Sequence, residues 1–151
     1  MNYNDYLAGN YVKYIGEERK AYYGLIGKIL SIAEKDDPDI FTLLFKKAGE
    51  DSLEELRVRG GIDGIRIDKF FLQKQGFKCW TMSNGWERCE KDDIFIIIDA
   101  LDNCRIRKKH ATIQNPTDAN EVIEKTEVLK FVHSYQNYFH QVLNKSTEVN
   151  L

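Results

Sequence analysis

Short apolar runs separated by polar segments fill the first sixty residues. A period of two residues, or a run of four to eight apolar residues between turn signals, is typical of strands. Glycines at positions 24 and 27 let a strand bend or bulge where a side chain would clash. The charged residues 46–55 predict a loop or a short helical turn. Strands are therefore predicted at residues 10–15, 22–32, 40–45 and 56–59.

The remainder of the chain combines short strands with two helical segments. Asp68 is a suitable N-cap for a helix over residues 69–75, and Gly76 is suited to its C-terminal end. A last helix is predicted over residues 132–144, with one apolar face made by Val132, Tyr135, Tyr138, Phe139 and Val142. Further strands are expected at residues 65–67, 79–82, 86–89, 94–98, 104–110 and 127–131.

The Asn84-Gly85 pair predicts a β-hairpin, and two registers are compatible with it. A two-residue loop places Trp80 opposite Cys89. A three-residue loop that includes Ser83 places Cys79 opposite Cys89 and allows a cross-strand bridge. The odd number of cysteines and the absence of a secretion signal favour reduced thiols.

These elements predict an α+β, β-rich fold. We expect an SH3-like small barrel at residues 1–60 and a hairpin-rich unit with two helices at residues 61–151, either as two units or as one continuous domain.

Composition adds few constraints. The chain has 151 residues, 42% of them hydrophobic, which is enough for a core. Its net charge of −2 gives no overall bias toward nucleic acid or an anionic membrane. The first residues lack a signal-peptide pattern, and the longest apolar run, residues 94–98, is far shorter than the ~20 residues of a membrane-spanning helix. We therefore expect a cytoplasmic protein without membrane association.

The candidate binding surface consists of Arg105, Arg107 and Lys109, which alternate along one strand, and of Trp86 beside the hairpin turn. The basic residues suit a phosphate backbone or an acidic partner. The alternative, which we favour, is an edge strand protected by charge. Trp86 could join Trp80, Tyr22 and Tyr23 in an aromatic peptide-binding patch, but we favour core and cross-strand packing as the explanation for these residues.

Other polar groups give weaker signals. His133, Gln136, Asn137 and His140 lie away from the apolar stripe of the last helix, and we interpret them as its solvated side rather than as a recognition face. Cys79, Cys89, Cys104 and His110 lack the close cysteine pair of structural zinc sites. No nucleophile stands out together with a base. The glycine-rich segment Gly60-Gly61-Ile62-Asp63-Gly64 lacks the Gly-Lys-Ser/Thr ending of a phosphate-binding loop. No cofactor or metal is therefore expected.

Three segments of the chain, residues 9–12, 65–77 and 129–139, resemble an uncharacterised family of small proteins from phages and mobile elements of gut bacteria. In that family the last segment often reads His-x-x-Gln-Asn followed by aromatic residues, as His133, Gln136 and Asn137 do here. The motifs are structural, so the resemblance implies a cellular setting and transfers no catalytic residue.

The first functional hypothesis is a non-enzymatic module that binds a host or element-encoded protein and blocks it. The alternative is a nucleic-acid-binding accessory protein that uses the basic strand, whose binding would weaken steeply with salt. An enzyme with a non-standard site is the third hypothesis, and it requires a His, Cys or acidic cluster in a deep pocket.

Overall fold

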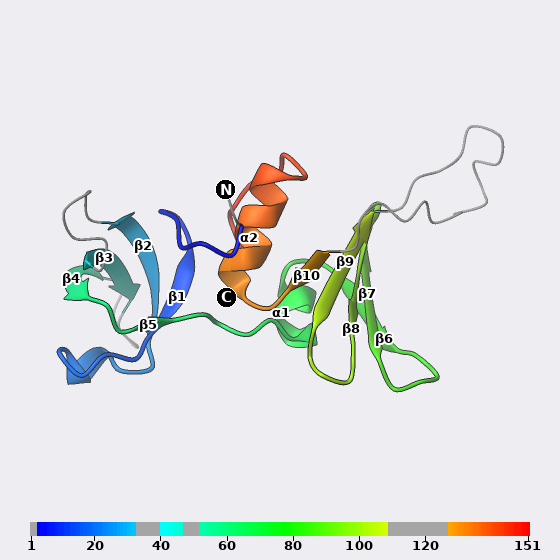
Figure 1. Cartoon of the computed structure of the whole chain (residues 1–151), viewed down its shortest axis with the longest axis horizontal. Coiled ribbons are helices and arrows are strands. Elements are labelled where there is room, and N and C mark those ends of the chain that lie inside the picture. The colour runs from blue at the N-terminus through cyan, green and yellow to red at the C-terminus, as the bar shows by residue number, and fades with distance from the viewer. Residues whose placement is uncertain (1–2, 33–39, 47–51, 109–126) are drawn as a thin grey trace. The chain divides into compact units, whose positions relative to one another are not determined.

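The computed structural model describes residues 3–32, 40–46, 52–108 and 127–151 (Figure 1). The chain forms two compact units, one of Met1–Arg66 with Phe131–Glu148 and the other of Ile67–Lys130 with Val149–Leu151. The predicted boundary at residue 60 would place every later residue in the second unit. In the structure the last helix instead returns to the first unit, because its polar side chains bind the N-terminal segment.

The first unit is an antiparallel five-stranded sheet with strand order β4-β3-β2-β1-β5. The predicted strand at residues 22–32 begins only at Ile26, because Tyr22 belongs to a short 3-10 helix. The loop predicted for residues 46–55 is wrong for Leu53 to Glu55, which pair with β3. The elements are β1 (Tyr11–Tyr14), η1 (Lys20–Tyr22), β2 (Ile26–Ile32), β3 (Ile40–Lys46), β4 (Leu53–Arg59), β5 (Ile62–Asp63) and α2 (Val132–Gln141).

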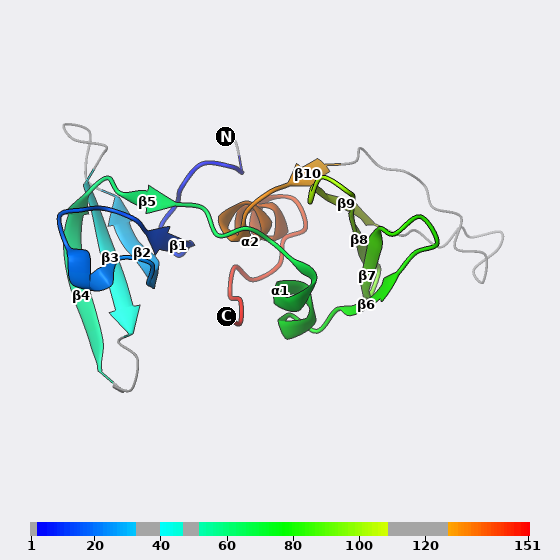
Figure 2. The ribbon, with the colours of Figure 1, turned by 90° about the horizontal axis from the view of Figure 1, so that it is seen from below.

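This sheet must curl, because β4 and β5 lie at opposite ends of the strand order yet follow each other in the chain. Four strand spacings in a flat sheet would be about 19 Å. The three Cα–Cα steps from Arg59 to Ile62 span at most about 11 Å. Figure 2 shows the chain passing directly from β4 into β5. No ladder joins these two strands in the described part of the chain, so the sheet is strongly curled but not closed.

A glycine pair makes the connection from β4 to β5. Gly60 and Gly61 have φ values of 64° and 69°, which side chains rarely adopt. A Cβ on Gly61 would also lie 2.7 Å from the Cα of Gly16. The N–H of Ile15 donates to the Gly61 carbonyl at 2.7 Å, so the turn is held against β1. Inward-facing residues of the sheet and of η1 then form the core: Val12, Tyr14, Tyr22, Ile29, Phe41, Leu43, Phe45 and Val58.

The polar side of α2 is buried, and the prediction of a solvated face is wrong for three of its four residues. His133, Gln136 and Asn137 are each at most 2% exposed, whereas His140 is exposed. Helical periodicity separates polar from apolar side chains, but it does not show whether a polar side is covered by another segment. Here residues 3–11 cover it.

Each of these side chains binds backbone of the N-terminal segment. Asn137 donates through Nδ2 to the carbonyls of Tyr3 (2.9 Å) and Asp5 (2.8 Å). The Oδ1 of Asn137 accepts from Asn10 Nδ2 at 2.8 Å. Gln136 accepts from the Tyr11 N–H at 2.9 Å and donates to the Gly9 carbonyl at 3.0 Å. These hydrogen bonds satisfy polar groups that would otherwise be costly to bury.

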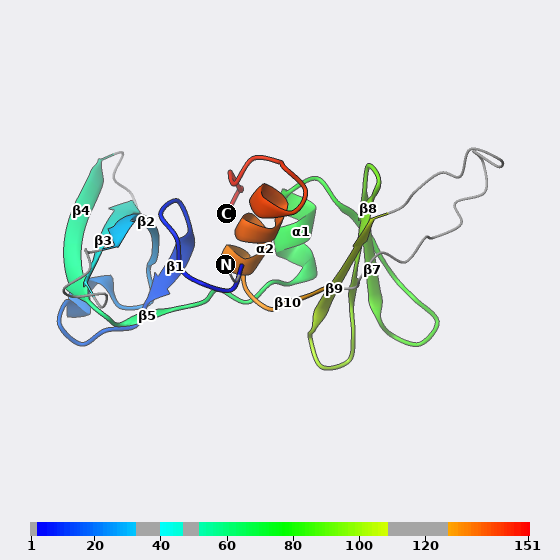
Figure 3. The ribbon, with the colours of Figure 1, turned by 45° about the horizontal axis from the view of Figure 1, so that its top comes forward.

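The second unit is an antiparallel meander with strand order β10-β9-β8-β7-β6, and α1 packs on β6 and β7. Figure 3 shows α1 and the strands β7 to β10 of this unit. The predicted N-cap is confirmed, because Asp68 Oδ1 accepts from the Phe71 N–H at 2.8 Å. Residues 65–67 form no full strand; only an isolated bridge joins Arg66 to Phe131. The elements are α1 (Lys69–Lys74), β6 (Lys78–Thr81), β7 (Glu87–Lys91), β8 (Ile94–Ile98), β9 (Cys104–Lys108) and β10 (Glu127–Leu129).

The hairpin adopts the register in which Cys79 faces Cys89 and Trp80 faces Arg88. The expectation of reduced thiols is wrong for this pair, since Cys79 and Cys89 form a disulfide with a Cα–Cα distance of 4.0 Å. The expectation of reduced thiols rested on the cellular compartment, whereas the two sulfurs are brought together by the register of the hairpin. Cys104 is buried and takes no part in this disulfide.

Candidate binding surface

The sheet of the second unit has two different faces. One face packs on α1 and holds the core residues Cys89, Ile94, Ile96, Ile98, Cys104, Ile106 and Leu129. Because strand side chains alternate, the residues between them point to the opposite side. This outer face consists of Lys78, Trp80, Arg88, Glu90, Phe95, Ile97, Arg105, Arg107 and Val128.

The outer face combines exposed apolar groups with cations. Trp80 is 46% exposed and Val128 is 36% exposed. The side chain of Arg105 is 45% exposed. Phe95 is also on this face but is fully buried, and the Arg88 guanidinium lies 4.4 Å from its ring centroid. An arginine held over an aromatic ring is attracted by the ring quadrupole and remains able to donate hydrogen bonds from its edge.

Carboxylates orient two arginines of this face, Arg88 and Arg105. Arg88 Nε donates to Glu90 Oε1 at 2.8 Å. Arg105 Nε lies 3.4 Å from Asp99 Oδ2. Burial alone would raise the pKa of Asp99, but hydrogen bonds from the Asn103 and Leu101 N–H groups and the Arg105 guanidinium outweigh it, and the pKa lies below its ordinary value. Asp99 therefore stays ionised and keeps Arg105 in place at neutral pH.

Two of the four predicted surface residues lie on this face by the strand register. Arg105 and Arg107 alternate along β9 as expected, while Lys109 lies outside the described residues. Trp86 lies at the turn end of β7, where its carbonyl accepts from the Met82 N–H at 2.7 Å, and it is half-buried. The edge-strand explanation is wrong for Arg105, because this residue pairs with Ile97 of β8 on one side and with Val128 of β10 on the other.

Arg88 was not predicted from the sequence, and Trp80 was considered for an aromatic peptide-binding patch but was interpreted as a packing residue. The signal for both was the alternation along the hairpin, which could be used only once its register was known. The aromatic patch is not supported for Tyr22, which is buried in the first core and donates its O–H to Glu54. Tyr23 is 64% exposed in the first unit.

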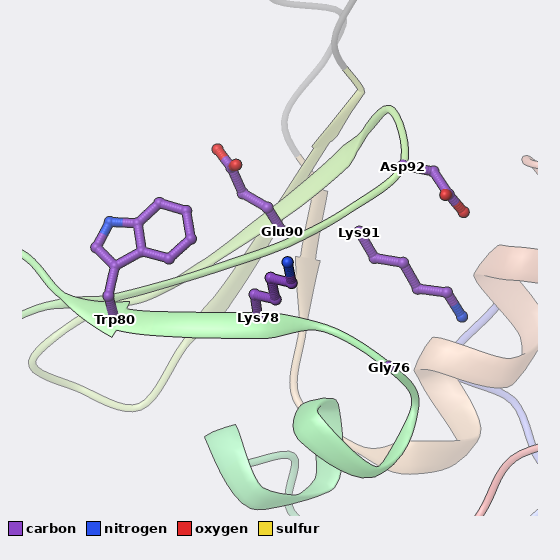
Figure 4. A pocket seen from close by; sticks show the side chains of 6 residues that line it. All are labelled: Gly76, Lys78, Trp80, Glu90, Lys91 and Asp92. Atoms are coloured by element: carbon purple, nitrogen blue, oxygen red, sulfur yellow. The ribbon is translucent and has the colours of Figure 1, made fainter.

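A shallow pocket of about 440 Å³ lies at the β6 end of the outer face (Figure 4). Lys78 and Trp80 line it from β6, opposite Glu90 of β7. The Nζ of Lys91 donates to the Gln75 carbonyl at 2.7 Å, so this cation is held by the turn that follows α1. The remaining lining residues are Gly76 and Asp92.

The other candidate chemistry does not assemble in the residues that the structure covers. Cys79 and Cys89 are bonded to each other, Cys104 lies 4.0 Å from the Ile67 carbonyl, and His110 is outside the described residues. No group of three or more His, Cys, Asp or Glu side chains able to hold a metal ion occurs among the described residues. Within the same residues, no helix has the length and apolar character required to cross a membrane.

Comparisons with protein-family models, with curated proteins and with solved structures find no match to this chain.

Proposed function

We propose that the protein is a non-enzymatic interaction module that binds a partner protein through the outer face of the β6–β10 sheet. The observation that carries this proposal is the exposed Trp80 on the same sheet face as Arg88 and Arg105. Tryptophan and arginine are the residue types most enriched among those that dominate protein–protein binding energy. In a phage or mobile element, such a module would bind a host protein and block it.

The charges of the outer face favour an acidic partner with apolar side chains. Among the described residues, the four cations Lys78, Arg88, Arg105 and Arg107 outnumber the two carboxylates that bind them, Glu90 and Asp99. Exposed Val128 and Trp80 add apolar area between and beside these cations. Such a mixture is typical of protein interfaces, in which arginine and aromatic residues surround a desolvated centre.

The strand order of the first unit supports a finer proposal about its fold. A meander of four strands is followed by a short fifth strand that returns to β1. We propose that this curled sheet is a small barrel of the SH3-like kind, and that it holds the N-terminal segment against α2.

Nucleic acid is the second candidate ligand. Arg105 and Arg107 are two residues apart on one strand, which places their Cα atoms roughly 7 Å apart on the same face. Both guanidinium groups can then reach the backbone of one nucleic-acid strand, and binding would weaken steeply with salt.

A capture experiment with the tagged full chain separates these candidates. Host-cell lysate is applied to the wild type and to Trp80→Ala and Arg105→Gln, with and without nuclease. The matched controls are Tyr23→Ala and Arg57→Gln, which change exposed residues of the first unit. We expect a stoichiometric protein that survives nuclease, binds both controls and is lost from both outer-face variants.

Two results would contradict the proposal. Capture that is equal for Trp80→Ala, Arg105→Gln and wild type would exclude the outer face. Partners that disappear on nuclease treatment, together with salt-dependent binding of purified DNA or RNA, would assign the face to nucleic acid. Thermal unfolding of each variant verifies that it is folded.

A further inference from the structure

Strand β6 lies at the edge of its sheet. Within residues 3–32, 40–46, 52–108 and 127–151 it pairs only with β7, so one side of its backbone has no strand partner there. Such an edge presents N–H and C=O groups to which another chain can add a strand. The strand is accessible, because Lys78, Trp80 and Thr81 are exposed.

The register shows which backbone groups point outward. The Met82 N–H donates to the Trp86 carbonyl at 2.7 Å. Hydrogen-bonded and non-hydrogen-bonded residue pairs alternate along an antiparallel ladder, so Trp80 and Lys78 are also hydrogen-bonded to their partners in β7. Cys79 and Cys89, whose Cα atoms are 4.0 Å apart, form the intervening close pair. The N–H and C=O groups of Cys79 and Thr81 therefore point away from β7.

The side chains beside this edge define what an added strand must carry. Lys78 is exposed and has no ion-pair partner among the described residues, because the nearby Glu90 binds Arg88 at 2.8 Å. Trp80, two residues further on the same face, is 46% exposed. Lys78 and Trp80 also line the pocket of about 440 Å³ (Figure 4).

We propose that an extended segment of the partner protein adds to β6 as a sixth strand, with an acidic residue beside Lys78 and an apolar residue beside Trp80. Cys79 and Thr81 supply the backbone hydrogen bonds, which give affinity without sequence preference. Lys78 and Trp80 supply specificity, because alternate residues of the added strand face them. This inference rests on the proposed function, since it names how the partner reaches the outer face.

The test selects binding peptides from a random peptide display library on the full-length protein, and measures affinity with a synthetic peptide of the enriched sequence. We expect enriched sequences to place an acidic residue two positions from an apolar one. Thr81→Pro removes one outward N–H without removing a bond to β7, and edge strands tolerate proline at such positions. It should weaken binding at least 10-fold.

Two comparisons make the result specific. Thr81→Val loses the same 3.0 Å hydrogen bond to Glu87 as the proline variant but keeps the N–H, so it should bind like the wild type. Lys78→Glu should weaken the acidic peptide at least 10-fold and should bind a peptide in which the acidic residue is replaced by lysine. This charge-reversal test at Lys78 remains informative even if Thr81→Pro does not fold.

Three outcomes would overturn the inference. The first is that no sequence is enriched, and the second is equal binding by wild type and Thr81→Pro. The third is a dimer of the chain alone that Thr81→Pro abolishes, which would assign the edge to a second copy. If captured partners are lost with Arg105→Gln but retained with Thr81→Pro and Lys78→Glu, the proposed function holds and this inference fails.

Discussion

Replacing Asn137 by alanine tests whether the polar side of α2 stabilises the fold. The side chain makes three buried hydrogen bonds of 2.8–2.9 Å, to Tyr3, Asp5 and Asn10. A net contribution of about 1 kcal/mol per bond, and about 1 kcal/mol more for the Asn10 amide left unpaired, sum to roughly 4 kcal/mol. The higher helix propensity of alanine returns about 0.6 kcal/mol. The expected loss in unfolding free energy is therefore about 3 kcal/mol.

Thermal and urea unfolding of the full chain, followed by circular dichroism, measures this loss. About 3 kcal/mol corresponds to a decrease in Tm of about 6–12 °C for a chain of this size. The control is His140→Ala, an exposed position on the same helix, which should change the unfolding free energy by less than about 0.5 kcal/mol. Proteolysis within residues 3–10 should also become faster, because the segment loses its contacts with α2.

A change of less than about 0.5 kcal/mol for Asn137→Ala would refute the reasoning, because a solvated face responds in that way. Equal effects of Asn137→Ala and His140→Ala would have the same meaning. A large loss of stability without faster cleavage of the N-terminal segment would show that the bonds to Tyr3 and Asp5 do not hold it.

Two further predictions concern the first unit. Burial lowers the pKa of His133, although the Asn4 carbonyl and the charge of Asp63 act in the opposite direction. The stability that the neutral ring contributes is present above about pH 6.5 and is lost as the pH falls toward the lowered pKa. Between about pH 6.5 and 5, the unfolding free energy of His133→Gln should therefore fall less than that of the wild type. Parallel curves of unfolding free energy against pH for the two proteins would contradict this. Gly61→Ala should destabilise by more than the roughly 1–3 kcal/mol that a strained backbone costs, because its Cβ would meet Gly16. Gly60→Ala has the same positive φ but open space, so equal losses in the two variants would exclude the close contact with Gly16.

Local features of the chain were predictable from the sequence because they depend on a few neighbouring residues. The cap at Asp68 requires only that a carboxylate stands three residues before the Phe71 N–H, because the first N–H groups of a helix have no carbonyl partner within the helix. The hairpin follows from Asn84 and Gly85, and Gly85 has the positive φ of 86° that such a turn requires. The buried strand at residues 94–98 follows from its continuous apolar run.

Long-range pairing decided the features on which the candidate site depends. The neighbours of β9 determine that Arg105 lies within a sheet face rather than at an edge. The hairpin register joins Cys79 to Cys89 and places Trp80 with Arg88. Both registers were compatible with the turn residues, so only the tertiary arrangement distinguishes them.

Most element types followed from the sequence, since hydrophobic period, capping residues and turn residues are local properties. Exceptions include Tyr22, predicted in a strand, and Leu53 to Glu55, predicted in a loop. The tertiary structure decided which polar residues are buried. Gln136 and Asn137 have the pattern of a solvated helix face, yet each binds backbone groups more than a hundred residues away in the chain. Backbone N–H and C=O groups are the same in every residue, so the sequence carries no signal of where such partners lie.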